Sequence, residues 1–296
     1  MNKLEFLEKR KSVRNYKNKQ LSAEDKRNLL SMLEAPNLLG EIPGYELVFI
    51  EDGPRAAIKL EGFAGYSGVM IEAPHYIAVF AEKKCINMRK SAYEVEDIVL
   101  KMMAMEVGSC WISIKDSDSA KVAMGWTDKA ELIALVALGY PKEENYFSKL
   151  FSNLQHPLIN PLKEGYANLN LETKNGMPLR EETSSFVYLD TWGNSTGYGE
   201  LVRRGIDKVY HYLKYAPSWG NRQPWKFIID KDDIILCIHE DEKLGRINEC
   251  LDAGIAMYYF KVAMEGHGLR GEWHFDGLDL DYGVPDDYWV AGRFAL

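Results

Sequence analysis

The stretch APSWGNRQPW, residues 216–225, joins the expected end of a helix to the expected start of a strand. Trp225 opens the apolar run WKFII, which is typical of a buried strand. Asn221 and Gln223 offer the amide donors and acceptors that the edge of a heteroaromatic ring needs. Two prolines stiffen the loop, so that ordering it around a ligand costs less. The alternative interpretation is an ordinary helix–strand connector, and Trp225 is expected in the core in either case.

A second polar stretch, RKSVR at residues 10–14, places several cationic groups close together. In an extended segment Arg10, Ser12 and Arg14 point the same way, because alternate side chains share a side. Arginine presents a planar donor fork that suits a phosphate or a carbonyl-rich ring edge. An isolated segment of this kind is more often a solvated basic turn, so its meaning depends on the rest of the chain.

Composition places the chain among globular proteins. Of its 296 residues 46% are hydrophobic and 27% charged, and the formal net charge is −8. An acidic chain argues against nucleic acid or an anionic membrane as a main partner. No apolar stretch is long enough to cross a bilayer and the N-terminus has no signal-peptide pattern, so we expect a cytoplasmic protein. The four cysteines form no C-x-x-C or zinc-like spacing and are expected to be reduced thiols: Cys85, Cys110, Cys237 and Cys250.

Hydrophobic periodicity predicts the main elements of the first half. Ser22 and Asp25 form a plausible N-terminal cap for a helix that follows them. The stretch from residue 142 to about 194 lacks strong periodicity and is expected to be a surface connector. The expected helices cover 3–9, 23–34 and 93–106, and the expected strands cover 45–51, 75–82 and 131–141.

The sequence pattern returns in the second half. Ala216-Pro217 follows Ala35-Pro36 by 181 positions (216 − 35), and Ala263-Met264-Glu265 follows Ala104-Met105-Glu106 by 159 (263 − 104). The order of these echoes predicts an internal duplication. The difference between the offsets, 22 residues, predicts a shorter second copy, and we expect the missing piece around the strand HYIAVFAE.

Four motifs resemble those of the FMN-dependent nitroreductases. APSWGNRQPWKF resembles that family's A-P-S-x-x-N-x-Q-P-W-x-F signature, and RKSVRNY resembles its R-x-S-x-R-x-[YF] motif. VGSCWIS and ALGYP resemble the family's G-x-x-S/T-C-W-I segment and the strand after it. The resemblance implies an α+β fold of two fused halves, each with a central, mainly antiparallel or mixed sheet flanked by helices. The halves would be residues 1–150 and 196–296, joined by a connector at 151–195.

The resemblance also implies where a cofactor binds. In the family, FMN sits between two subunits, held by the R-x-S-x-R motif of one and the A-P-S motif of the other. Here the first half keeps Arg10, Ser12 and Arg14, whereas its own A-P-S motif reads Ala35-Pro36-Asn37-Leu38-Leu39-Gly40, with Ile42 in place of the glutamine. The second half keeps Ser218, Asn221 and Gln223, and has Thr191, Gly193 and Ser195 at the 181 offset. This complementary loss predicts a monomeric pseudo-dimer with one FMN site.

Site roles follow from the same resemblance. Arg10, Lys11 and Ser12 would hold the phosphate and ribityl chain, and Arg14 would approach the N1–C2 edge of the ring. The backbone of Trp111, Ile112 and Ser113 would lie near flavin N5. Basic residues that the family carries after G-Y-P are reduced here to Lys142 and Lys149. The opposite side of the cofactor would be lined by Pro217, Ser218, Asn221 and Gln223.

The expected activity is an NAD(P)H oxidoreductase with a ping-pong mechanism and a nitroaromatic, quinone or similar acceptor. The flavin would carry the chemistry, so we assign no catalytic side chain and no metal. Three alternatives stay open. They are other FMN chemistry (dehalogenation, flavin fragmentation or dehydrogenation), a non-catalytic flavin-binding or storage protein, and a flavin-free interaction protein.

Overall fold

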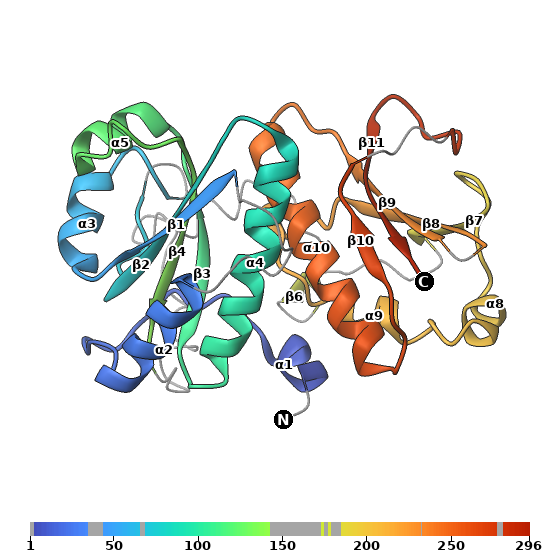
Figure 1. Cartoon of the computed structure of the whole chain (residues 1–296), viewed down its shortest axis with the longest axis horizontal. Coiled ribbons are helices and arrows are strands. Elements are labelled where there is room, and N and C mark those ends of the chain that lie inside the picture. The colour runs from blue at the N-terminus through green and yellow to red at the C-terminus, as the bar shows by residue number, and fades with distance from the viewer. Residues whose placement is uncertain are drawn as a thin grey trace.

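The chain forms two sheets on either side of a pair of long helices (Figure 1). The computed structural model describes residues 3–34, 44–65, 69–142, 173–174, 177–178, 185–231, 233–276 and 281–296. The decayed motif expected at residues 35–42 and much of the 151–195 connector lie outside them. Each half is of the α+β class that the sequence predicts.

The first sheet is antiparallel throughout and has the strand order β1-β2-β4-β3. Both faces of β2 are buried: Ile77 and Val79 face the central helices, whereas Tyr76 and Phe80 face the outer ones. The alternation of side chains along a strand explains why this segment is apolar without interruption. The strands are β1 (Tyr45–Ile50), β2 (His75–Ala81), β3 (Gly108–Ser113) and β4 (Glu131–Gly139), with α3 (Gly53–Leu60) and α5 (Ser117–Met124) on the outer face.

The second sheet has the order β10-β11-β9-β8-β7 and is mixed, because β7 pairs in parallel with β8. Four of its strands repeat the order of the first sheet, with β8, β9, β11 and β10 in the places of β1, β2, β4 and β3. The predicted duplication requires such a repeat. The strands are β7 (Val187–Leu189), β8 (Trp225–Asp230), β9 (Asp233–His239), β10 (Glu272–His274) and β11 (Tyr288–Ala295).

The matching strand order shows where the second half is shorter. The connection between β1 and β2 has 24 residues, 51–74, and includes α3. The connection between β8 and β9 has only residues 231 and 232. The difference, 24 − 2, is the 22 residues that separate the two sequence offsets. The prediction that the HYIAVFAE strand is the missing piece is therefore wrong. That strand has its counterpart in β9, and the second half lacks the helix and loop before it.

Helices predicted from local signals agree with the structure. Helices α1 (Lys3–Lys9) and α2 (Ala23–Glu34) have the predicted bounds, and the Ser22 hydroxyl accepts a 3.0 Å hydrogen bond from the backbone N–H of Asp25. The third predicted helix is longer than expected: α4 covers Cys85–Met103 and begins without a side-chain cap. Remaining short elements are β5 (Thr173–Lys174), β6 (Met177–Pro178), α8 (Tyr198–Arg203), α9 (Val209–Leu213) and the 3₁₀ turn η3 (Trp219–Asn221).

The two halves meet where α4 packs against α10 (Arg246–Gly266) (Figure 1). The hydroxyl of Tyr258 donates a 2.8 Å hydrogen bond to Asp97 across this contact. The helix backbones approach closely at Gly254, where a Cβ atom would lie 2.1 Å from the carbonyl oxygen of Arg89. A glycine at this position therefore sets the spacing of the pair.

A disulfide between Cys85 of α4 and Cys250 of α10 also joins the halves, with the Cα atoms 5.6 Å apart. The prediction of four reduced thiols is therefore wrong for this pair, because the fold brings together residues 165 positions apart. Cys110 and Cys237 are free and buried. Among the described residues, none of the helices is both long enough and apolar enough to cross a membrane.

Candidate functional site

The segment that carries RKSVR runs along the edge of the first sheet, beside β3. Ser12 forms a parallel bridge with Ser109, and the Val13 N–H donates a 2.8 Å hydrogen bond to the Ser109 carbonyl. Further along, the Lys17 N–H donates to the carbonyl of Tyr140. These backbone bonds hold the segment extended.

A buried carboxylate on α4 fixes the first arginine of this segment. Oε1 of Glu96 lies 3.4 Å from Nη2 of Arg10, and it accepts a 2.6 Å hydrogen bond from Nε1 of Trp111. Arg10 also approaches the Ser12 hydroxyl at 3.4 Å. Arg10, Ser12 and Trp111, all predicted site residues, thus form one cluster around Glu96. Oε2 of Glu96 is buried and has no hydrogen-bond partner within the described chain.

Lys11 is placed differently from its neighbours. It is exposed and, with Val13, lines a cavity that Arg10 also borders. Ser12 and Arg14 do not line that cavity. The alternation of an extended chain explains why Lys11 and Val13 lie together and apart from Ser12 and Arg14, whereas Arg10, directly after α1, borders the cavity as well. The structure therefore divides the predicted set, with Lys11 turned away from Ser12 and Arg14.

The remaining first-half residues lie on β3. Trp111 faces α4, whereas Ile112 is buried in the outer core beneath α3 and α5. At the end of the strand the Ser113 carbonyl accepts a 2.9 Å hydrogen bond from the Gly65 N–H. β4 pairs along one edge of the backbone at 111–113, and on the other edge Gly65 holds Ser113.

The APSWGNRQPW loop is strained and tightly held. Gly220, Asn221 and Gln223 have φ values of 58°, 56° and 50°, a region that residues other than glycine seldom adopt. The Ser218 hydroxyl accepts a 2.9 Å hydrogen bond from the Gln223 N–H, and the Ser218 carbonyl accepts one from the Asn221 N–H. Strained backbone that is held in this way is common at functional sites. Pro217 precedes this turn and is partly buried.

Asp252 on α10 anchors the loop from below. Its carboxyl oxygens accept from the Trp219 N–H at 3.0 and 3.2 Å, and burial raises the pKa of this carboxyl well above its usual range. Nδ2 of Asn221 is buried and unpartnered among the residues that the structure describes. Trp225 is in the core, as predicted, and the Arg222 guanidinium lies over the ring of Trp219.

The two clusters are attached to the two central helices. The hydrogen bond between Tyr258 and Asp97 aligns the two helices along their length. Glu96 is the neighbour of Asp97 on α4, and Asp252 lies six residues before Tyr258 on α10. Six residues of helix span about 9 Å. Glu96 and Asp252 are therefore about one and a half to two helical turns apart along the α4–α10 pair. Sequence reasoning missed both anchors, because a carboxylate within a helical pattern normally indicates a solvated face.

The prediction that Thr191, Gly193 and Ser195 are the second-half counterparts of Arg10, Ser12 and Arg14 is wrong. Ser12 lies beside β3, whose structural counterpart is β10. Thr191 and Ser195 instead flank β7, at the opposite edge of the second sheet, with Gly193 in the turn between them. A constant offset of 181 fails here because the chain follows a different edge of the sheet in each half.

Comparison with known proteins identifies the family. A family model described as "Putative TM nitroreductase" matches residues 2–164, more than half of the chain. The chain belongs to this nitroreductase family. A curated relative from Archaeoglobus fulgidus, named "Putative NADH dehydrogenase/NAD(P)H nitroreductase", is 25% identical over 158 residues, which are 49% of this chain and 88% of the relative.

Solved structures show how much of the fold is shared. A structure described as a putative nitroreductase from Thermotoga maritima covers 100% of this chain and 94% of its own, with a TM-score of 0.57 at 19% identity. The likeness therefore extends over both halves. An FMN-dependent nitroreductase from Clostridium difficile covers 51% of this chain and 96% of its own, at 24% identity and a TM-score of 0.41.

Proposed function

We propose that this chain is an FMN-dependent oxidoreductase that uses NAD(P)H in a ping-pong mechanism, with one FMN bound between its two halves. The acceptor would be a nitroaromatic, a quinone or a similar small molecule. Membership of the nitroreductase family supports the class of reaction, and the curated relative carries an NAD(P)H nitroreductase name.

One observation carries the proposal: each central helix holds a separate cluster of polar groups that suits part of a flavin nucleotide. Arg10 is held by Glu96 on α4 and approaches the Ser12 hydroxyl, whereas Ser218 and Asn221 belong to the loop anchored on α10. The buried amide Nδ2 of Asn221 can donate to a ring carbonyl, which would satisfy an atom that otherwise costs free energy. The donor sets therefore fit a cofactor that bridges the halves.

One further contact supports the proposed binding of the FMN phosphate near the RKSVR segment. The Lys142 N–H donates a 3.0 Å hydrogen bond to the carbonyl of Asn15, so this basic residue lies beside the RKSVR segment. Arg10 already shares its charge with Glu96 and is only 7% exposed. Lys142 and Ser12 would then supply donors that Arg10 alone does not.

FMN, when bound, would supply the two-electron redox chemistry between NAD(P)H and the second substrate. Arg14 would place a cation near the N1–C2 edge, where negative charge develops on reduction, and would raise the reduction potential. The rigid backbone at 111–113 would offer an N–H donor near N5. Pro217, Ser218 and Gln223 would close the opposite side, with Lys11 at the outer end of the phosphate.

The experiment is a flavin titration with matched variants. Purified protein is expected to absorb at about 450 nm and to release about one FMN per chain. The absorbance should bleach with NAD(P)H under anaerobic conditions. Arg14→Gln and Asn221→Asp, from the two clusters, should each lower FMN affinity. Arg55→Gln, on the exposed face of α3, should not.

Each other outcome has a definite meaning. Two FMN per chain, or full affinity in both variants, would contradict a single site between the halves. A yellow protein that NAD(P)H fails to bleach would favour the flavin-storage alternative. A colourless protein that takes up no added FMN would refute flavin binding altogether.

A further inference from the structure

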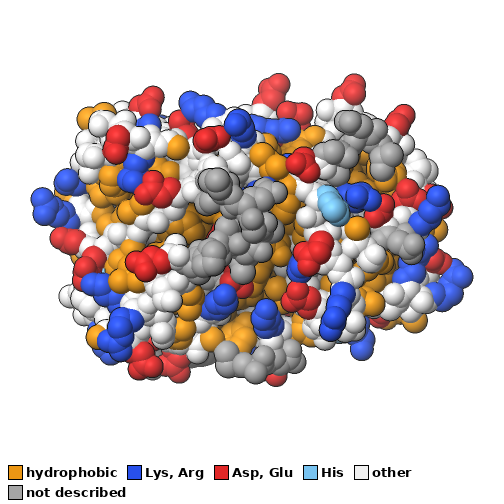
Figure 2. Space-filling view, viewed as in Figure 1, with side chains coloured by type: hydrophobic (Ala, Val, Ile, Leu, Met, Phe, Trp, Pro, Cys, Tyr) orange, Lys and Arg blue, Asp and Glu red, His pale blue; other side chains and the backbone are white. Residues whose placement is uncertain are grey.

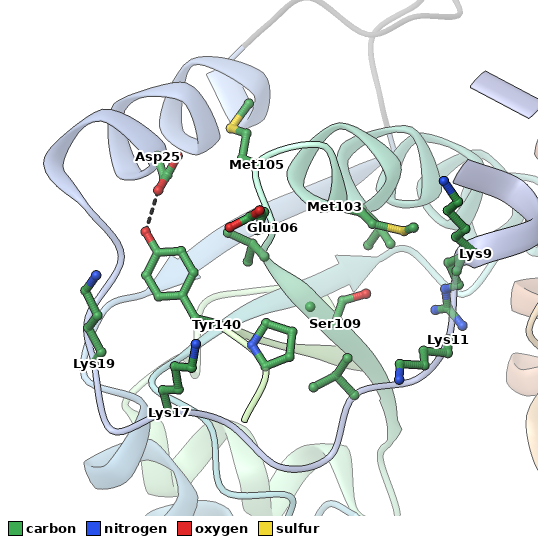
Figure 3. A pocket seen from close by; sticks show the side chains of 16 residues that line it. Lys9, Lys11, Lys17, Lys19, Asp25, Met103, Met105, Glu106, Ser109 and Tyr140 are labelled. Carbon is green, nitrogen blue, oxygen red and sulfur yellow. Dashed lines mark hydrogen bonds between the residues drawn. The ribbon is translucent and has the colours of Figure 1, made fainter. Parts of the chain in front are cut away.

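A cavity of about 600 Å³ lies between α2, the C-terminal end of α4 and the segment 9–19 (Figure 3). Its size is that of a site for a small organic molecule. Tyr140 and Ser109 contribute hydroxyl groups to its wall. Ser12 and Arg14 are not part of its lining, and neither is the loop at 216–225.

The cavity gathers positive charge. Its lining includes five cationic side chains and two acidic ones, although the chain as a whole carries −8. On the face drawn in Figure 2, by contrast, acidic and basic side chains are interspersed. The cationic members of the lining are Lys9, Arg10, Lys11, Lys17 and Lys19.

The acidic groups nearby leave part of this charge uncompensated. Arg10 is paired with Glu96, and Lys9 lies 3.5 Å from Glu5. The acids of the lining, Asp25 and Glu106, then face the three remaining lysines, so they offset only part of the charge. Within the part of the chain that the structure describes, neither Lys11 nor Lys17 has an acidic partner. No acid of the described residues therefore offsets these two ammonium groups.

The rest of the lining is apolar. Its apolar members include Val99 and Met103 of α4, together with Val107 and Pro141. Methionine adapts its shape to flat or irregular ligands and contacts aromatic rings favourably. An inorganic ion would leave this surface in contact with water, whereas a ligand with an apolar body would cover it.

We propose that this cavity binds a small organic anion with an apolar body, such as an aryl or acyl carboxylate, sulfonate or phosphate monoester. The anionic group pairs with the lysine ammonium groups at the rim, where Lys17 and Lys19 approach Tyr140 (Figure 3). The apolar body lies against Met103 and Val99. The cavity borders the proposed flavin site, because Arg10 and Lys11 belong to both, but Ser12, Arg14 and the loop at 216–225 lie outside its lining. The proposal for the cavity does not depend on flavin binding.

The test uses 2-naphthalenesulfonate as the anion and 2-naphthol as its neutral counterpart, titrated into the full chain by calorimetry. The double variant Lys17→Glu/Lys19→Glu reverses two rim charges outside the proposed flavin set. It should weaken sulfonate binding by about ten-fold or more. The matched control Lys59→Glu/Lys208→Glu makes the same charge change on exposed residues outside the cavity lining, and should stay within about two-fold.

2-Naphthol should bind more weakly than the sulfonate and equally in all three proteins. Undiminished sulfonate binding in Lys17→Glu/Lys19→Glu, or an equal loss in the control, would overturn the proposal. Loss of sulfonate binding on saturation with FMN would also overturn it, because the cavity would then belong to the flavin. Failure of the protein to bind FMN leaves the sulfonate titration intact, so the two proposals fail separately.

Discussion

Nε1 of Trp111 on β3 donates a 2.6 Å hydrogen bond to Oε1 of Glu96 on α4, and the carboxylate is fully buried. The same oxygen holds Arg10. One buried acid thus connects the edge strand of the first sheet, the central helix and the segment proposed to hold the flavin phosphate.

Replacing Glu96 by glutamine should lower the free energy of unfolding by about 3 kcal/mol, because it removes the buried carboxylate that faces the Arg10 cation. Urea denaturation measures the change. Removing both charges, in Arg10→Met/Glu96→Leu, should cost less than the single change. Glu24→Gln, at an exposed position of α2, is the control and should be neutral. A single variant as stable as the parent would show that the pair does not fix the segment.

Glu94 should make stability depend on pH. Burial, and then repulsion from Asp97, raise its pKa from 4.5 to about 7, while Lys101 opposes them and the Tyr45 hydroxyl donates a hydrogen bond to it. Below pH 4.5 the group is neutral in both states. Between 4.5 and about 7 only the unfolded chain ionises, so stability falls as pH rises and then levels off.

Glu94→Gln removes this loss. Partial hydration screens the effect, so the variant should gain about 1–2 kcal/mol relative to the parent between pH 5 and pH 8. Thermal unfolding at the two pH values measures it. A constant difference between the two proteins over that range would contradict the raised pKa.

Gly254 should tolerate no side chain. Gly254→Ala places a methyl group against the Arg89 carbonyl oxygen, which forces α4 and α10 apart and should cost about 2 kcal/mol or more. Gly199→Ala is the matched control. Nothing lies within 4 Å of a Cβ at that exposed helical position, so alanine there should be neutral or slightly stabilising. Equal effects of the two changes in urea denaturation would argue against close packing of the central helices.

Reduction of the Cys85–Cys250 disulfide should lower the free energy of unfolding by about 2–4 kcal/mol, because the bond closes a long loop in the unfolded chain. Dithiothreitol should have no such effect on Cys85→Ser/Cys250→Ser. Alkylation followed by mass spectrometry should modify two cysteines in the unfolded, unreduced chain and four after reduction. Four alkylated cysteines without reduction would show that the bond does not form.

Elements with local signals were predictable from the sequence. The bounds of α2 follow from its cap at Ser22 and its leucine spacing, and the buried strands follow from their apolar runs. The start of α4 was not predictable, since no side chain caps it. The repeat order was visible in the sequence, but only the strand pairing showed that α3, and not a strand, is what the second half lacks.

The candidate site also has residues that could be predicted from the sequence and residues that could not. The two motifs stand out because their residues are adjacent in sequence. Their anchors, Glu96 and Asp252, do not, because each lies within a helix whose burial depends on contacts with distant segments. The disulfide was missed for a similar reason, since spacing alone does not determine which of four cysteines pair.

The close approach at Gly254 bears on how substitutions accumulate at the contact between α4 and α10 during evolution. In a symmetric dimer every substitution at the interface appears on both sides at once. In this chain the glycine on α10 faces a backbone carbonyl on α4, and each helix is encoded separately. Either surface can therefore vary alone, so fusion allows the two sides of the interface to specialise for different tasks.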